Sequence, residues 1–260
     1  MGETRFAMAV LDGHHAIVTG GGRGIGRAAA AALTEAGATV TVTGRNEDRL
    51  AEAVASGDAA GYFVADATDQ RALHDGLQKA AAERGTVDIL VANAGSAESA
   101  PFAGTDPDMF RRMFELNTLS VVHAAHEVLG SMVVHGFGRI VAIASTAGLK
   151  GYGYVSAYCA SKHATVGLVR SLAVETAKTG VTVNAICPGY ADTDLVRDNV
   201  ARIVKATGKP EESVLAAMLK DAPIGRLIKP EEVAAAVVFL CSPAASAITG
   251  AVLSVAGGEV

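Results

Sequence analysis

The chain has 260 residues, 50% of them hydrophobic, and a formal net charge of −5. This length and composition fit one α/β domain with a large core, and the negative charge excludes the basic footprint of a nucleic-acid-binding protein. Three cysteines, Cys159, Cys187 and Cys241, form no CxxC pair, which argues against a disulfide or zinc framework and favours a cytoplasmic setting. We expect neither a signal peptide nor a membrane span, because no apolar run approaches about 18 residues.

Short β-branched segments alternate with longer Ala- and Leu-rich segments along the chain. The predicted strands are His15–Thr19, Thr39–Thr43, Gly61–Ala65, Ile89–Ala92, Arg139–Ala144, Thr182–Ile186 and Val252–Val255. The predicted helices are Gly24–Ala36, Glu47–Ser56, Gln70–Arg84, Pro107–Val134, Ala157–Lys178 and Pro230–Leu240. This alternation indicates βαβ units with parallel strands and right-handed crossovers. It predicts that residues 1–260 form a single Rossmann-type doubly wound α/β domain, a seven-stranded parallel sheet with helices on both faces.

One segment interrupts this alternation. Between Pro188 and Gly225 the chain has two helical stretches and no strand, and it follows a strand that we expect near the centre of the sheet. Ligands of such folds bind outside the carboxyl ends of the strands, and long insertions in compact domains are usually functional. We therefore predict a substrate lid over residues 190–225; the alternative is an ordinary surface excursion.

The first predicted strand runs into a glycine-rich turn, TGGGRGIG at residues 19–26. Glycines let the backbone turn sharply and approach a pyrophosphate, and the following helix offers free N–H groups and its positive dipole end. A tight turn alone would also use glycines, but this one lies between a strand and a helix, as a dinucleotide site requires. The predicted cofactor-binding residues in this turn are Gly20, Gly22, Arg23, Gly24, Ile25 and Gly26.

A second motif, Tyr158-Cys159-Ala160-Ser161-Lys162, places a phenol and an ammonium four residues apart, on one face of a helix. A neighbouring ammonium favours the phenolate and moves a phenol, whose pKa is ordinarily about 10, toward the working range. Ser145 ends a predicted strand thirteen residues earlier, where a hydroxyl can hydrogen-bond a substrate oxygen. The alternatives are an exposed helix face and a strand-capping serine.

The TGxxxGxG spacing of the turn and the YxxxK pattern resemble the short-chain dehydrogenase/reductase family, and the resemblance spans almost the whole chain. Members interconvert a carbonyl and a secondary alcohol with NAD(P)(H), and the resemblance implies a catalytic set of Asn117, Ser145, Tyr158 and Lys162. Tyr158 would be the general acid in reduction and the base in oxidation, while Lys162 would lower its pKa and bind the nicotinamide ribose. Ser145 would orient and polarise the carbonyl, and Asn117 would hold a water that links Lys162 to solvent.

The same resemblance extends the cofactor site and implies an assembly. Its further cofactor-binding residues are Asp66 and Ala67 at the adenine edge, Asn93, Ala94 and Gly95 in the NAG motif, Tyr158 and Lys162, and Pro188, Gly189 and Thr193 beside the nicotinamide. The resemblance also implies a homotetramer. The helices Pro107–Val134 and Ala157–Lys178 would pair across one two-fold axis, and the C-terminal strand with Gly257-Gly258 would lie at another.

The end of the second predicted strand bears on the choice of cofactor. NAD-selective relatives carry an acid there, which binds the ribose hydroxyls and repels a 2′-phosphate. Here Gly44 stands at that position, Arg45 follows it, and Arg23 lies in the glycine-rich turn. Two guanidinium groups could bracket a 2′-phosphate, so we expect NADP(H) to be preferred with NAD(H) possible; alternatively both arginines are solvated surface residues.

The residues expected around the substrate are mostly small or apolar: Ser96, Ala97, Thr146, Ala147, Tyr152, Val155, Gly189 and Tyr190. The sequence is similar to bacterial polyketide and 3-oxoacyl-thioester ketoreductases and to 3-hydroxybutyrate dehydrogenases. The latter hold a free carboxylate with Gln, His and Lys, where this chain has Ala97, Ala147 and Val155. An unpartnered buried carboxylate is costly, so we expect a neutral ketone or a 3-oxoacyl thioester as the small-molecule substrate.

Two alternatives remain open from the sequence. The enzyme could run as a catabolic NAD-dependent hydroxyacyl or alcohol dehydrogenase, because the chemistry is reversible. It could also be a catalytically silent cofactor-binding sensor. His123 and His126 are spaced i, i+3 on a predicted helix, but no third ligand accompanies them, so we expect no metal site.

Overall fold

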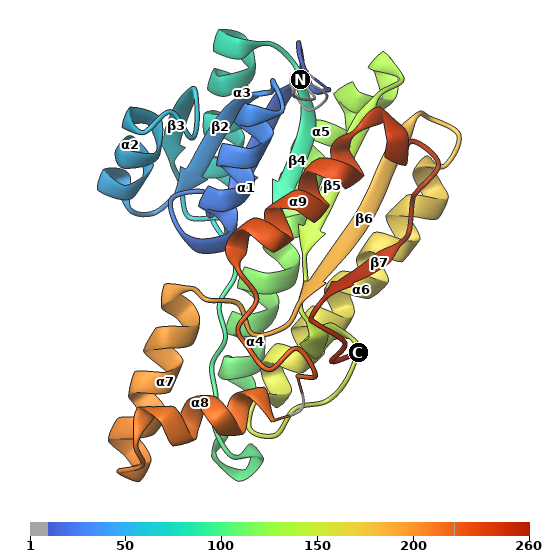
Figure 1. The fold of residues 1–260 in the computed structure, drawn as a ribbon. Coiled ribbons are helices and arrows are strands. Elements are labelled where there is room, and N and C mark those ends of the chain that lie inside the picture. Colours follow the sequence, from blue (N-terminus) through green and yellow to red (C-terminus); the bar gives the residue numbers. More distant parts are fainter. Residues whose placement is uncertain (1–9, 221) are drawn as a thin grey trace, which may run out of the picture.

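The computed structural model describes residues 10–220 and 222–260 (Figure 1). Its strands are β1 (His15–Thr19), β2 (Thr39–Gly44), β3 (Gly61–Val64), β4 (Val87–Ala92), β5 (Gly138–Ile143), β6 (Val181–Pro188) and β7 (Val252–Val255). They form one parallel sheet in the order β3-β2-β1-β4-β5-β6-β7. The predicted fold class, a Rossmann-type doubly wound α/β fold with a seven-stranded parallel sheet, is confirmed.

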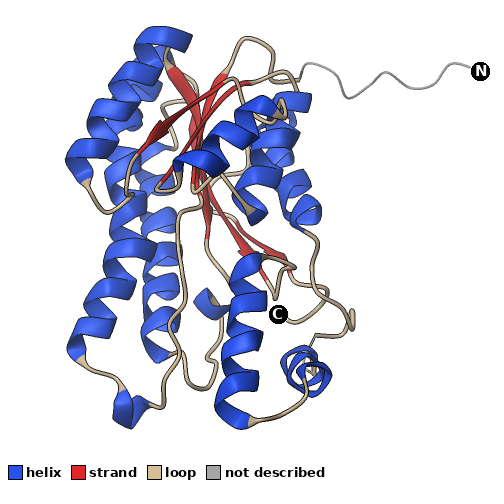
Figure 2. Cartoon of the chain, turned by 90° about the vertical axis from the view of Figure 1, so that its left-hand side faces the viewer, coloured by secondary structure: helices blue, strands red, loops and turns tan. Residues whose placement is uncertain are grey.

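Helices cover both faces of this sheet (Figure 2). They are α1 (Gly24–Glu35), α2 (Glu47–Ala55), α3 (Gln70–Arg84), α4 (Pro107–Phe114), α5 (Ser120–His135), α6 (Ser156–Thr176), α7 (Asp194–Thr207), α8 (Glu211–Leu219) and α9 (Pro230–Cys241). One core joins α1, α2 and α9 to the sheet, and a second core joins α3, α5 and α6 to its other face. The chain thus forms three layers.

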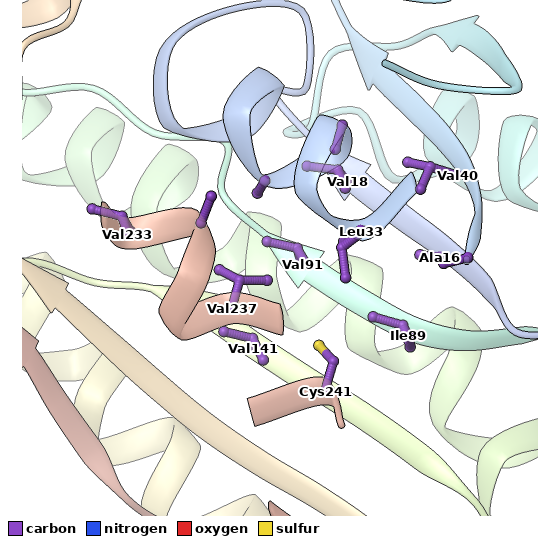
Figure 3. Packing of buried hydrophobic residues seen from close by; sticks show 14 of the residues in the cluster. Ala16, Val18, Leu33, Val40, Ile89, Val91, Val141, Val233, Val237 and Cys241 are labelled. Carbon is purple, nitrogen blue, oxygen red and sulfur yellow. The ribbon is translucent and has the colours of Figure 1, made fainter. Parts of the chain in front are cut away.

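Successive strand residues serve opposite cores, because side chains alternate across a strand. Ala16 and Val18 of β1 lie in the core beneath α1 and α9, where Leu33 and Val237 meet them (Figure 3). Ile17 between them packs in the core under α3 and α5. Burial on both faces explains why the middle of β1, Ala16-Ile17-Val18, is continuously apolar.

The sheet order creates the crevice in which a ligand can bind. From β1 the chain proceeds outward to β2 and β3, then returns to β4 on the other side of β1 and continues to β7. The connections after β1 and β4 therefore diverge at a topological switch point, where open α/β sheets bind their ligands. The glycine-rich turn follows β1, and the Asn93-Ala94-Gly95 segment follows β4.

Two details of the sequence-based prediction are wrong. The predicted helix Pro107–Val134 is helical throughout, but it is not uniformly α-helical: a π-helical turn, Glu115–Leu119, lies between α4 and α5 and accommodates one extra residue. The strand that precedes the proposed lid was expected near the centre of the sheet, but β6 lies next to the edge strand β7. The central strand is β4, which has three strands on either side of it.

The segment after β6 forms a separate small unit that protrudes from the sheet (Figure 1). Its helices α7 and α8 share a hydrophobic cluster of Val196, Val200 and Val214 that is distinct from the two main cores. The base of the unit is closed by main-chain hydrogen bonds: Asp192 N donates to Ile228 O, and Ile228 N donates to Tyr190 O, both at 2.8 Å. Across residues 10–220 and 222–260, none of the helices combines the length and the apolar character that crossing a membrane would require.

Candidate active site

The glycine-rich turn adopts a conformation that requires glycine at several positions. Gly20 and Gly24 have φ angles of 64° and 52°, in the left-handed region where side chains are disfavoured. A Cβ on Gly26 would stand 2.3 Å from the carbonyl oxygen of Gly20. The turn therefore brings the first turn of α1 against the end of β1, as close approach to a pyrophosphate demands.

The turn is tied to the end of β4 by hydrogen bonds. Thr19 Oγ1 accepts from the main-chain nitrogens of Asn93 and Ala94, each at 3.0 Å, and Asn93 Nδ2 donates to the Gly20 carbonyl at 3.2 Å. Thr193 also contacts the turn, since a Cβ on Gly24 would lie 3.1 Å from its Cγ2. Candidate cofactor-binding residues that follow β1, β4 and β6 thus lie next to one another.

The open amino end of α1 fits a dinucleotide pyrophosphate. The helix begins at Gly24 after Arg23, its N-cap side chain makes no capping hydrogen bond, and no acidic residue stands in its first turn. Its first N–H groups and dipole therefore remain available to an anion. Gly22 and Ile25 pack away from this opening, Gly22 against α2 and Ile25 against the first core.

The phenol of Tyr158 lies beside two groups with which a reaction centre can be built. The hydroxyl of Ser145, two residues beyond β5, lies close enough to interact with it, and Lys162 Nζ lies 5.8 Å from the centroid of its ring. Ser145 Oγ also accepts a hydrogen bond from Ala147 N at 3.1 Å, which fixes the hydroxyl. Ser145 and Tyr158 thus converge from β5 and α6 at the carboxyl edge of the sheet.

Burial sets the protonation of this pair. It raises the pKa of Tyr158 to about 12, and the hydrogen bond with Ser145 opposes that effect. It lowers the pKa of Lys162 to about 8, while the nearby Cys187 acts in the opposite sense. We expected Lys162 to lower the pKa of Tyr158, but this pKa is raised because desolvation of the phenol dominates. The ammonium of Lys162 does not bind the phenol; its Nζ donates to the carbonyl oxygen of Ile143 at 2.8 Å.

Asn117 lies in the π-helical turn, and its side chain is held from three directions. Oδ1 accepts from Ser96 N at 3.1 Å, while Nδ2 donates to Ser96 O at 3.0 Å and to Ser161 Oγ at 3.2 Å. The residue is 1% exposed. A Cβ on Gly95 would lie 2.8 Å from Asn117 Oδ1 and 3.5 Å from Lys162 Nζ, so Gly95 separates these two groups.

The adenosine end of the crevice is lined by charged side chains. Arg45 Nη1 lies 3.7 Å from Asp66 Oδ2, and Arg23 Nη1 lies 3.6 Å from Asp194 Oδ2. Burial raises the pKa of Asp66, but hydrogen bonds from Thr68 and the charge of Arg45 outweigh it and lower the pKa overall. Ala67 beside it is buried.

Gly44 leaves space at the position where an acid would select NAD. A Cβ on this residue would meet only Leu50, at 3.7 Å. The sequence analysis did not identify one charged group in this region, Arg49 on α2. Its Nη1 lies 3.0 Å from Asp194 Oδ2. No local sequence pattern indicates this ion pair, because the two residues are far apart in the chain.

Three of the residues expected around the substrate, Thr146, Tyr152 and Tyr190, lie together, with the rings of Tyr152 and Tyr190 edge to face at 6.3 Å. Tyr152 Oη lies 2.7 Å from Thr146 Oγ1 and 2.5 Å from the Glu259 carboxylate.

Other residues expected near the substrate are held by the surrounding chain. Ala147 is buried, and the main chain of Ser96 is hydrogen-bonded to the Asn117 side chain. Pro188 ends β6, and Gly189 N donates to Val255 O at 3.1 Å. Sequence reasoning did not single out Glu259.

The remaining candidates lie at the margin of this region. Ala97 and Val155 are half-buried, on the segments that follow β4 and precede α6. His123 lies 3.8 Å from Glu115. Within the described ranges 10–220 and 222–260, no group of three or more His, Cys, Asp or Glu side chains is placed to hold a metal ion.

A glycine-rich turn at a switch point and a Ser, Tyr and Lys set at the neighbouring strand end define the class: a nicotinamide-dependent oxidoreductase with a Rossmann-type fold. Residues 20–259 match the family described as "Enoyl-(Acyl carrier protein) reductase". The chain belongs to the short-chain dehydrogenase/reductase family, oxidoreductases that act on CH–OH groups with NAD or NADP.

Known proteins similar to this chain carry related activities. It is 39% identical over 244 residues to the acetoacetyl-CoA reductase of Rhizobium meliloti (strain 1021), covering 94% of this chain and 97% of the relative. It is 41% identical over 247 residues to the cis-4-hydroxycyclohexanecarboxylate dehydrogenase of Sinomonas cyclohexanicum, covering 94% and 95%. A crystal structure of an actinorhodin polyketide ketoreductase variant with NADPH superposes with a TM-score of 0.91 at 33% identity, covering 97% and 99% of the two chains.

Proposed function

We propose that this enzyme reduces a neutral ketone or a 3-oxoacyl thioester to the secondary alcohol with NADPH. The observation that carries the proposal is the convergence of the Ser145 hydroxyl and the protonated Tyr158 phenol beside Lys162. This group lies at the carboxyl edge of the sheet, next to the dinucleotide crevice. The proposed catalytic residues are Asn117, Ser145, Tyr158 and Lys162.

Each side chain has a role that follows from its surroundings. Ser145 donates a hydrogen bond to the substrate oxygen and stabilises the negative charge that develops there. Tyr158 gives its proton to that oxygen, and a pKa raised to about 12 keeps this proton in place at neutral pH. Lys162 would hold the nicotinamide ribose, and Asn117 fixes the segment that follows β4. NADPH, when bound, supplies the hydride.

The preference for NADPH is supported by the adenosine end of the crevice. Gly44 carries no acid that would repel a 2′-phosphate, and the exposed guanidinium groups of Arg23 and Arg45 lie at this end, each paired with a carboxylate at more than 3.5 Å. Such loose pairs are readily exchanged for a bidentate phosphate contact. The structural neighbour crystallised with NADPH supports the same choice; NAD(H) remains a possible second cofactor.

The substrate class rests on the positions that hold a carboxylate in hydroxybutyrate dehydrogenases. These positions are Ala97, Ala147 and Val155 here, and none can pair with a charge. The two relatives are named for activity on a CoA thioester and on a carboxylate-bearing alcohol, so similarity alone does not choose between these substrate classes. A catabolic NAD-dependent dehydrogenase is the second candidate, favoured by the reversibility of the chemistry and by the second of these relatives.

We also propose the setting in which the enzyme works. Residues 1–260 act as a single domain, and the α7–α8 unit with its flanking residues, 190–225, is a substrate lid, supported by its separate cluster and its closed base. Exposed apolar side chains on α5 and α6, including Val134 and Val174, support a homotetramer. The three free cysteines support a cytoplasmic setting.

The proposal is tested by turnover with NADPH on a panel of neutral ketones and 3-oxoacyl thioesters. The wild-type enzyme should reduce members of the panel, and Tyr158→Phe should lower kcat by about 10²–10⁴-fold while its affinity for NADPH stays close to wild type. Binding of NADPH without turnover of any member would support the cofactor-binding sensor instead. A Tyr158→Phe variant that keeps most of its kcat would refute the catalytic assignment.

A further inference from the structure

A buried carboxylate close to the carboxyl end of the chain is not used by the proposed mechanism. The side chain of Glu259 is 2% exposed. Its Oε1 accepts a hydrogen bond from Tyr152 Oη at 2.5 Å and lies 3.3 Å from Lys150 Nζ. Lys150 Nζ also donates to the main-chain carbonyl oxygen of Glu259 at 3.3 Å. Two separate contacts thus join Lys150 to this residue, only one of them through the carboxylate.

The carboxylate lies at the edge of the sheet where the substrate must bind. β5, β6 and β7 are parallel neighbours, so their carboxyl ends meet at one edge. Tyr152 connects Glu259 to Thr146, the residue after Ser145. A Cβ on Gly189, which follows β6, would stand 3.0 Å from Glu259 Oε2. Glu259 therefore lies against both segments that flank the substrate side of the centre.

The hydrogen bonds of this group leave one carboxylate oxygen unused. Tyr152 has a single proton, which it donates to Glu259, so the hydroxyl of Thr146 donates to the phenol in turn. Consistent with this, burial and the carboxylate raise the pKa of Tyr152, while the Thr146 hydrogen bond opposes them. Glu259 Oε2 is buried and has no hydrogen-bond partner among residues 10–220 and 222–260. A buried carboxylate oxygen without a partner disfavours a second negative charge nearby.

The same arrangement neutralises the one cation in this group. Lys150 is two-thirds buried and lies 5.1 Å from the centroid of the Tyr152 ring, so it could reach a carboxylate on the substrate side. Its charge is already balanced by Glu259 Oε1. If the Glu259 charge were removed, the main-chain contact would still hold Lys150 in place, and its ammonium would be left to attract an anion.

We propose that Glu259 is a specificity-determining residue that excludes free carboxylate substrates, both through its own charge and by neutralising Lys150. The enzyme thereby selects neutral ketones and esters or thioesters over the corresponding 3-oxo acids. This inference rests on the proposed ketone reduction, and it deepens that proposal by assigning the discrimination to one side chain.

The test compares acetoacetate with ethyl acetoacetate at saturating NADPH, using the ratio of their kcat/KM values. Glu259→Gln keeps the shape and an acceptor for Tyr152, and the acid-to-ester ratio should rise at least tenfold. In the double variant Lys150→Met/Glu259→Gln, the part of the rise that comes from the freed ammonium should be lost, so the ratio should lie between the wild-type value and that of Glu259→Gln. Glu35→Gln, which removes an exposed carboxylate at the end of α1, should leave the ratio at the wild-type value. A merely structural role would lower kcat/KM for both substrates and leave the ratio unchanged, which would overturn the inference.

A measurement on the wild type alone guards against a variant that does not fold. Butyrate and butyramide have the same shape and differ in charge, and both can be tested as inhibitors of ethyl acetoacetate reduction. Butyrate should inhibit at least tenfold more weakly than butyramide; equal inhibition would overturn the inference while leaving ketone reduction intact. A wild-type enzyme that reduces no neutral ketone would contradict the proposed function itself.

Discussion

The ammonium of Lys162 donates a 2.8 Å hydrogen bond to the main-chain carbonyl oxygen of Ile143, the last residue of β5. Lys162 is 4% exposed, and no carboxylate enters among the causes of its pKa shift. The folded chain therefore buries this cation beside the Ile143 carbonyl dipole, the Tyr158 ring and Cys187, with no carboxylate partner among residues 10–220 and 222–260. The burial of this cation positions its side chain for catalysis but lowers the free energy of unfolding.

Lys162→Met should consequently raise the stability of the protein at neutral pH while it removes most of the activity. Burial lowers the pKa of Lys162 to about 8 from its ordinary value of 10.5, so the folded state binds this proton more weakly than the unfolded state does. The resulting cost is complete below pH 8 and disappears as pH rises from 8 toward 10.5. It amounts to about 3 kcal/mol, at 1.36 kcal/mol per pKa unit.

Thermal unfolding between pH 7 and pH 10 measures this effect. The Tm of Lys162→Met should exceed that of the wild type at pH 7, and the difference should shrink as pH rises. Lys79→Met, which removes an exposed lysine on α3, is the control and should show no such trend. A Lys162→Met variant that is less stable than the wild type throughout would show that the Ile143 hydrogen bond outweighs the desolvation.

Most of the architecture could be predicted from the sequence because each strand and helix carries its own periodicity. The π-helical turn at Glu115–Leu119 could not, since a single extra residue per turn leaves the apolar pattern of the surrounding helix almost unchanged. The position of β6 in the sheet was misjudged because strand order depends on crossovers rather than on the strand's own residues.

The candidate site divides in the same way. The glycine-rich turn and the YxxxK pattern are local, so their geometry follows from spacing. Glu259 is different, because its contacts with Lys150 and Tyr152 lie 109 and 107 residues away along the chain. An acid at the second-last position has no local pattern, and its burial arises only when the ends of β5, β6 and β7 meet. Contacts between residues so far apart in the chain can be identified only in the folded structure.

Gly95→Ala should impair catalysis without unfolding the protein. The added methyl group would lie 2.8 Å from Asn117 Oδ1 and 3.5 Å from Lys162 Nζ, and Asn117 cannot yield easily because three hydrogen bonds hold it. A shift of the order of 1 Å in positioned groups can lower activity by about 10²-fold. Gly104→Ala is the matched control, because a Cβ there meets nothing within 4 Å. Steady-state kinetics should show a large fall in kcat for Gly95→Ala alone; equal activity of the two variants would contradict a positioning role for Gly95.

The proposed lid should exchange its amide hydrogens faster than the layers around the sheet and should become protected when substrate binds. Its helices α7 and α8 are stabilised by a small cluster of their own, and their connection to the rest includes the Asp194–Arg49 ion pair and the hydrogen bonds at the base. Regions with few buried contacts open at low free energy. Hydrogen exchange should be compared for the enzyme alone and with NADP⁺ and the product alcohol, with α6 as the internal reference. Strong and equal protection of residues 194–219 under both conditions would argue against a lid.

Gly44→Asp should shift the cofactor preference from NADPH toward NADH. The position has room for the side chain, since the only neighbour of an added Cβ is Leu50 at 3.7 Å. A carboxylate there would repel the 2′-phosphate and would also compete with it for Arg45, whose present partner Asp66 lies 3.7 Å away. With NADH the same carboxylate could accept hydrogen bonds from the ribose hydroxyls. Because about 1.4 kcal/mol corresponds to a factor of ten, one such repulsion should lower the NADPH-to-NADH ratio of kcat/KM values at least tenfold. Ala55→Asp, at the exposed far end of α2, adds the same charge away from the crevice and should leave the ratio unchanged. A wild-type preference for NADH would show that the two arginines serve another purpose, and an unchanged ratio in Gly44→Asp would place the 2′-phosphate elsewhere.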